Sequence, residues 1–220
     1  MIRNAYLRVL SFIFLSFLCA GLCLAAEAMD EQRPKDTRSA VFERIAAQAA
    51  ALETISSDFI QEQHVSMLKE SIVSSGRFAY ERPDRIYWEV IKPSPSGFAV
   101  MGDKARRWEG DLGKSEMFDV QKVPVVRAIV EQVFAWARAD FQWLEKRYRI
   151  VVTERDQTSL KLFPLSSQEK KFISHLNIVF SGDWSHVAAV DIHDKSGDHI
   201  LITFSRTSLN EPLHKDLFPR

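Results

Sequence analysis

The chain has 220 residues, with 29 basic and 29 acidic side chains, so its formal net charge is zero. This balance argues against a nucleic-acid-binding protein, which usually carries a basic excess. The only two cysteines, Cys19 and Cys23, lie near the N-terminus, so the rest of the chain has no thiol for a disulfide or a thiolate nucleophile. Fifteen Phe and five Trp residues supply enough apolar surface for one domain with a sizeable core.

The first 28 residues have the pattern of a secretory signal peptide. Arg3 and Arg8 precede an apolar run, and the small residues that follow offer a cleavage site after Ala28 or after Ala25. The run is short for a membrane span, although a retained anchor is an alternative. We therefore predict that residues 1–28 are removed and that residues 29–220 form one exported domain.

Two segments have the periodicity of amphipathic helices. The first is predicted to begin at Asp36 or Ser39 and to end near Ile55, because apolar residues recur three or four positions apart. The second is predicted from Pro124 to Leu144, with Pro124 in the first turn, where proline is tolerated. The apolar stripes are formed by Phe42, Ile45, Ala49 and Leu52 in the first helix and by Val126, Ile129, Val130, Val133 and Ala137 in the second.

Most other segments alternate between apolar and polar residues and end at turn-forming residues, which predicts antiparallel strands joined by hairpins. About nine to eleven short strands in one meander are expected to curl into a barrel or half-barrel, with the two helices over its open mouth. The predicted strands are Ser57–Met67, Ile72–Tyr80, Arg85–Ile91, Phe98–Met101, Arg106–Glu109 and Ser115–Val120, followed after Arg147 by strands through Ile150, Leu162, Ile178, Val190 and Ile202.

Two of these strands, within Gly76–Pro93, carry an arginine on an apolar face. Phe78, Tyr80 and Arg82 have the same parity and therefore share one face of the first strand. A buried charge is costly unless it has a partner. Arg82 therefore either lies in water at the rim of the sheet or is paired for a purpose. A paired Arg82 would close the mouth of a cavity by reaching carbonyl groups of a helix, or would bind an anionic head group.

The sequence offers little support for catalysis. It has no G-x-S-x-G elbow and no glycine-rich phosphate loop. Ser185 and His186 are adjacent, and neighbours on a strand point to opposite faces, so they are not expected to pair. A metal site at one hairpin is an alternative that we do not favour, since the motif H-E-x-x-H is absent; its candidate ligands are Asp191, His193, Asp194, Asp198 and His199. An exported, cysteine-free chain with aromatic strand faces and helical covers instead favours binding of an apolar ligand.

The order of these short motifs resembles the periplasmic lipoprotein carrier (LolA) family and its relatives. The matching pieces are Phe59-x-Gln61, Gly76 with Phe78 and Tyr80, Arg82-Pro83 with Arg85 and Trp88, Pro93, Trp108 after Gly102-Asp103, Leu162-x-Pro164, Ile178 with Phe180, and Asn210-x-x-Leu213 before Leu217-Phe218. The family usually has Asp-Gly where this chain has Gly102-Asp103, and the segment from Pro124 to Leu144 is long and aromatic. A specialised LolA-like protein with another acylated cargo is therefore an alternative to the general carrier.

The resemblance implies a mainly β fold with some α: a single-domain antiparallel unclosed β-barrel, or half-barrel, covered by an α-helical lid, with a hydrophobic cavity between them. It implies a periplasmic carrier that accepts a lipoprotein from an inner-membrane ABC release complex and passes it to an outer-membrane receptor. Arg82 matches the family arginine that contacts the lid in the closed form. The other residues predicted to line the cavity are Phe59, Phe78, Tyr80, Trp88, Phe98, Val100, Trp108, Ile129 and Val133.

These observations together predict a monomeric, non-enzymatic carrier of acylated lipoproteins or lipids, without a cofactor, a metal or a nucleic-acid partner. Two other classes stay open. One is a periplasmic lipid-sensing or interaction module, which would usually carry a second domain. The other is a lipid hydrolase, which would turn over an ester and lose that activity when one serine or histidine is replaced.

Overall fold

The structure is a computed structural model that describes residues 35–110, 114–154 and 157–218. The predicted signal peptide therefore lies outside the described residues. The compact unit considered below begins at Asp36. None of the helices in the described segments is both long enough and apolar enough to cross a membrane.

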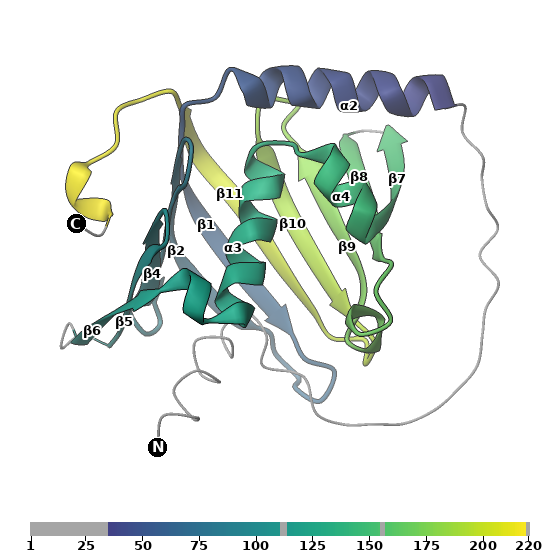
Figure 1. Ribbon diagram of the computed structural model, residues 1–220. Helices are drawn as coiled ribbons and strands as arrows, with labels where there is room; N and C mark the ends of the chain where they lie inside the picture. Colours follow the sequence, from purple (N-terminus) through teal and green to yellow (C-terminus); the bar gives the residue numbers. More distant parts are fainter. Residues whose placement is uncertain (1–34, 111–113, 155–156, 219–220) are drawn as a thin grey trace. The chain divides into compact units, whose positions relative to one another are not determined.

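Eleven strands of the described chain form one antiparallel sheet in the order β6-β5-β4-β3-β2-β1-β11-β10-β9-β8-β7 (Figure 1). The sheet is unclosed, because β6 and β7 stand at its two ends, which confirms the predicted architecture. The strands are β1 (Thr54–His64), β2 (Ile72–Glu81), β3 (Arg85–Lys92), β4 (Ser96–Met101), β5 (Lys104–Glu109), β6 (Lys114–Asp119), β7 (Tyr148–Glu154), β8 (Thr158–Pro164), β9 (Ile173–Phe180), β10 (Val187–Asp194) and β11 (His199–Leu209).

The first helix, α2 (Lys35–Ala50), is shorter than predicted. Ile55, the predicted helix end, belongs to β1 and pairs with Tyr80 on one side and Leu209 on the other. Leu52 is buried as the helical pattern required, but it lies in the connection after the helix. Asn210 holds this connection, since its Oδ1 accepts from the Glu53 N–H at 2.8 Å and its Nδ2 donates to the Ala51 carbonyl at 3.1 Å. Contacts distant in sequence therefore end the helix early. The first predicted strand ends early as well, at His64 rather than at Met67.

The predicted single helix from Pro124 to Leu144 is wrong, because the chain forms two helices, α3 (Pro124–Ala137) and α4 (Phe141–Arg147). Between them Ala139 has a positive φ of 49°, a conformation that ends a helix. Asp140 then begins the next helix, since its side chain accepts from the Trp143 N–H at 3.0 Å. Aspartate is a common N-cap residue, so Asp140 was an available signal for the start of a second helix. The prediction missed it because the apolar residues continue on both sides of Asp140.

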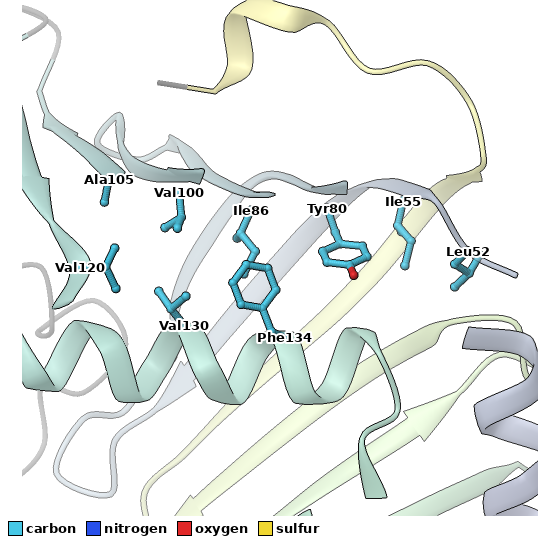
Figure 2. Packing of buried hydrophobic residues seen from close by; sticks show 9 residues of the cluster. All are labelled: Leu52, Ile55, Tyr80, Ile86, Val100, Ala105, Val120, Val130 and Phe134. Carbon is cyan, nitrogen blue, oxygen red and sulfur yellow. The ribbon is translucent and has the colours of Figure 1, made fainter. Parts of the chain in front are cut away.

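We call the side of the sheet that packs against α3 its inner face. On this face a row of side chains crosses β1 to β5, with Ile55 beside Tyr80, Tyr80 beside Ile86, Ile86 beside Val100 and Val100 beside Ala105. Figure 2 shows these side chains directed toward Val130 and Phe134 of α3. The Tyr80 and Phe134 rings meet edge to face, with centroids 6.1 Å apart. This part of the inner face is filled by its own side chains.

The opposite, outer face of β2 to β5 is covered by the C-terminal segment. Phe218 is buried in a cluster with Ala79, Tyr87 and Ala99, against which Leu213 and Leu217 also pack. In Figure 1 this segment runs away from the end of β11 to reach that side. Strands β2 to β5 are therefore covered on both faces, by α3 on one side and by the C-terminal segment on the other.

Gly76 shows why the strand sequence of β2 includes a glycine. A Cβ atom at this position would lie 1.8 Å from the carbonyl oxygen of Glu89 and 2.6 Å from the ring of Phe59. Neither contact is sterically allowed, so only glycine lets β3 and the Phe59 ring approach so closely. The Phe59 ring in turn stacks on Trp88 with a centroid distance of 4.2 Å.

Candidate functional site

A pocket with a volume of about 110 Å³ lies between the inner face of the sheet, α2 and the C-terminal half of α3. A single water needs roughly 10–15 Å³, so the space is larger than a hydration site. Small or apolar residues of both helices form one wall, and the sheet forms the other. Representative lining residues are Ile45 and Ala49 of α2, Val133, Trp136 and Ala137 of α3, and Phe78, Trp88, Val190, Ile202 and Phe204 of the sheet.

The sheet side of the pocket is built by three aromatic rings that contact one another. The centroids of Phe78 and Trp88 are 6.0 Å apart, those of Phe78 and Phe204 5.7 Å, and those of Trp88 and Phe204 6.3 Å. Edge-to-face and tilted arrangements of this kind are favourable for aromatic pairs. Because Phe59 backs Trp88 from the core, the wall is held in place without polar groups.

Of the residues predicted to line a cavity, Phe78, Trp88 and Val133 line this pocket. Phe59 lies behind Trp88 and is 1% exposed. The others lie elsewhere: Tyr80 and Val100 belong to the filled cluster under α3, Phe98 packs against that cluster, and the side chain of Ile129 is outside the described residues.

Trp108 lies on the outer face, where it packs against Tyr87 and the cluster around Phe218. The register of β4 and β5 explains this position, since Gly97 pairs with Trp108 and Phe98 pairs with Arg107. Residues directly opposite each other share a face, so Trp108 faces away from Phe98. Alternation within one strand shows that odd and even residues face opposite sides of the sheet. It does not indicate which of the two sides faces the helices, so the position of Trp108 was predicted wrongly.

Arg82 binds the end of α2. Its Nε donates to the carbonyl of Leu52 at 2.9 Å and its Nη2 donates to the carbonyl of Ala49 at 2.8 Å. The last carbonyls of a helix have no partner within the helix, and a guanidinium is well suited to them by charge and by geometry. Ala49 and Leu52 both line the pocket, so Arg82 ties the sheet to the part of α2 that covers it. A role of Arg82 in opening or closing the pocket stays a prediction.

The sequence reasoning missed a polar element of the pocket, the turn from Ser181 to His186 between β9 and β10. Trp184, Ser185 and His186 all line the pocket. The guanidinium of Arg44, from α2, lies 4.3 Å from the centre of the Trp184 ring, which connects the turn to the helix. The run Ser-Gly-Asp before Trp184 is typical of a turn and was the available signal.

The expectation that Ser185 and His186 would not pair is wrong, because they lie in this turn rather than on a strand. Ser185 Oγ is 2.9 Å from His186 Nδ1, and Asp183 Oδ1 accepts from Ser185 Oγ at 2.7 Å. In a hydrolytic triad the acid orients the histidine, whereas here it accepts from the serine. Hydrogen bonds from Ser181 and Ser185 lower the pKa of Asp183 to about 2, and burial lowers the pKa of His186. The arrangement therefore builds a rigid polar turn and lacks the hydrogen-bond order of a triad.

The histidines of the β10–β11 hairpin belong to a row on the outer face. The rings of His64, His199, His193 and His175 stack across four neighbouring strands, with successive centroid distances of 4.2, 5.0 and 4.3 Å. No three His, Cys, Asp or Glu side chains in the described segments are arranged to hold a metal ion. Rings that stack in this way share a plane direction, and their nitrogens do not converge on a common centre.

Residues 50–220 match the family described as "Outer membrane lipoprotein carrier protein LolA". The chain belongs to this family. A curated member, the outer-membrane lipoprotein carrier protein of Pseudoalteromonas translucida (strain TAC 125), is 22% identical over 171 residues, which are 78% of each chain. The matched residues include all eleven strands and the helices α3 and α4, whereas α2 (Lys35–Ala50) lies almost entirely before them.

Solved structures share the fold. An uncharacterized conserved protein from Thermus thermophilus is 7% identical and superposes with a TM-score of 0.51 over 84% of this chain and 95% of its own. MucB is 12% identical and superposes with a TM-score of 0.50 over 84% of this chain, which spans 63% of MucB. At these identities the similarity concerns the arrangement of the sheet and helices alone.

Proposed function

We propose that this protein is a periplasmic carrier that shields the acyl chains of lipoproteins, or of related lipids, during their transfer from the inner to the outer membrane. The observation that carries the proposal is the apolar pocket between the inner face and the two helices, in a chain of the LolA family. Each methylene group of an acyl chain that leaves water contributes about 0.8 kcal/mol. A chain of ordinary length therefore gains several kcal/mol from such a pocket without any catalytic group.

In this mechanism α2 acts as a lid. The pocket is bounded on one side by Ile45 and Ala49 of α2, so a displacement of this helix widens it. Two hydrogen bonds from Arg82 to the Ala49 and Leu52 carbonyls stabilise the closed position. Loading requires these bonds to break, and the burial of acyl chains compensates for their loss. The chemistry is reversible binding, so the protein is not an enzyme.

Membership of the LolA family supports a proposal for the partners. We propose that a monomer of this protein receives its cargo from an inner-membrane ABC release complex and delivers it to an outer-membrane receptor. The curated relative is named an outer-membrane lipoprotein carrier protein, which supports this direction of transfer. The mature protein would begin after the predicted signal peptide of residues 1–28.

The test is native mass spectrometry of the protein purified from periplasm without detergent, followed by solvent extraction of the bound material. We expect acylated lipoprotein or lipid in near-stoichiometric amount. Val133→Trp, which places an indole in the pocket, is expected to abolish the bound mass. Val151→Trp is the matched control, because Val151 is an exposed residue of β7 and its replacement leaves the pocket unchanged.

A wild-type protein free of lipid after purification, and after incubation with acylated peptide, would contradict the carrier role. A mass increase that comes only from a bound protein would favour the interaction module. Equal loading of Val133→Trp and wild type would place the acyl chains outside this pocket.

A further inference from the structure

The Ser181–His186 turn adds Ser185 and His186 to a pocket whose other lining residues are apolar or aromatic, except for Ser57 of β1. We infer that His186 is a specificity-determining residue of the pocket: its Nε2 accepts a hydrogen bond from an N–H group at the head of the bound acyl chain, so that an amide-linked chain is preferred over an ester. This inference rests on the proposed carrier function and assigns a role to a residue of the same pocket.

The directions of the hydrogen bonds determine which nitrogen of His186 carries the proton. Asp183 is a carboxylate and only accepts, so the single proton of Ser185 Oγ is donated to Asp183 Oδ1 over 2.7 Å. Ser185 Oγ is then left with lone pairs only toward His186 Nδ1, 2.9 Å away. His186 must therefore donate from Nδ1, and its Nε2 carries a lone pair when the ring is neutral.

Burial keeps the ring neutral at physiological pH. It lowers the pKa of His186 more than the neighbouring Asp183 carboxylate raises it. Nε2 has no hydrogen-bond partner in the described part of the chain, although His186 lines the pocket. A neutral imidazole with one bonded and one free nitrogen is an acceptor available to a ligand.

The turn is built to hold this ring in place. Asp183 Oδ1 also accepts from Ser181 Oγ at 2.6 Å and from the Ser185 N–H at 3.1 Å, and the His186 N–H donates to Ser181 Oγ at 3.2 Å. Trp184 has a φ of 67°, which is uncommon for a large residue and persists only where the surroundings enforce it. An acceptor fixed by this many local bonds loses little entropy when it binds a ligand.

A second pocket residue has an unpaired donor, but this donor is enclosed. Nε1 of Trp136 is buried without a hydrogen-bond partner among the described residues, and Trp136 lines the same pocket from α3. Because Nε1 has almost no accessible surface, the preference for an amide rests on the His186 acceptor. An amide presents an N–H that His186 Nε2 can accept from, whereas an ester presents acceptors only and leaves Nε2 unpaired.

The test compares two neutral probes of equal chain length, N-methylpalmitamide and methyl palmitate, by titration calorimetry against the full mature protein. We expect the wild type to bind the amide about fivefold to tenfold more tightly, the effect of one net hydrogen bond. His186→Phe keeps an aromatic ring but removes the acceptor, and is expected to bind both probes with the affinity that the wild type has for the ester. His175→Phe, on the outer face, is the matched control and is expected to change neither affinity.

Ser185→Ala provides a second variant that keeps the His186 ring and removes the group that determines its proton position. We expect its preference for the amide to be reduced but not lost. In the wild type, ¹⁵N NMR of the imidazole is expected to show the proton on Nδ1. A proton on Nε2 would overturn the inference.

The outcomes separate the two proposals. If neither probe binds the wild type, the carrier function fails and the role of His186 fails with it. If both probes bind equally, or if His186→Phe weakens both to the same extent, the pocket binds acyl chains but His186 does not select the amide.

Discussion

The two halves of the inner face differ in what the helices place against them. Under the middle of α3, Tyr80, Ile86, Val100 and Ala105 are completely buried, because Val130 and Phe134 fill the space above them. Around the pocket the sheet side chains are equally large, and they include Phe78, Trp88 and Phe204. There, however, the covering side includes Ala49 of α2, Ala137 of α3 and Ala139 of the connection between α3 and α4, next to the larger Ile45, Val133 and Trp136. Three alanines on the covering side therefore leave space above a sheet that is itself continuous.

The largest expected effect comes from removing the side chain of Phe134, which fills the packed half of the inner face under α3. Phe134→Ala should lower the free energy of unfolding by about 3–5 kcal/mol, the range for a buried phenylalanine. Urea unfolding measures it. Met67→Ala is the control, since Met67 is 92% exposed and its loss should stay within about 0.5 kcal/mol. A loss below about 1 kcal/mol for Phe134→Ala would show that this half is not a packed core.

A smaller effect is expected at Arg82, which lies next to the half of the inner face that holds the pocket. Arg82→Leu removes two charged hydrogen bonds, one to the last turn of α2 and one to the connection after it, and we expect it to destabilise the protein by about 2 kcal/mol while leaving it folded. Hydrogen exchange should become faster in α2 and stay unchanged in the central strands. Arg77→Leu serves as the control, because the Arg77 side chain is exposed and its ion pair with Asp58 spans 4.0 Å. Unchanged exchange in α2 would exclude Arg82 as its anchor and with it the proposed latch.

The smallest effect concerns the row of histidines on the outer face of β1, β11, β10 and β9. Burial is the main cause that lowers the pKa of His175 to about 4, with nearby Lys161 and His193 acting in the same direction, and burial also lowers the pKa of His199. An unfolded histidine titrates near about 6.5. Between these values the unfolded chain binds more protons than the folded chain, so stability should fall as the pH decreases from 7 to about 4.

The urea midpoint at pH 7 and at pH 5 measures this dependence. His193 has Asp191 Oδ2 at 2.7 Å from its Nε2, so His175 is the better residue to change. His175→Phe preserves a stacked ring and should reduce the difference between the two midpoints. His214→Phe, at an exposed position, should leave the difference as in the wild type. An equal pH dependence in all three proteins would show that the histidine row does not contribute.

Local patterns in the sequence predicted the approximate positions of the strands, both helical regions and the family. Alternation in β2 and β3 placed Phe78 and Trp88 on apolar faces, and both line the pocket. The order of weak motifs, none specific alone, indicated the LolA family, to which residues 50–220 belong. These features depend on local periodicity and on turn residues, and both can be read directly from the sequence.

Where the helices end and which residues meet at the pocket depend on long-range contacts, which local patterns do not contain. Ile55 left the helical pattern because Tyr80 and Leu209 pair with it, and Trp108 faces outward because the register of β4 and β5 requires it. The Ser181–His186 turn joined the pocket through contact with Arg44 of α2, more than a hundred residues earlier in the chain. Register and long-range contact bring together residues that no local pattern connects, because a sheet assembles strands from distant parts of the sequence.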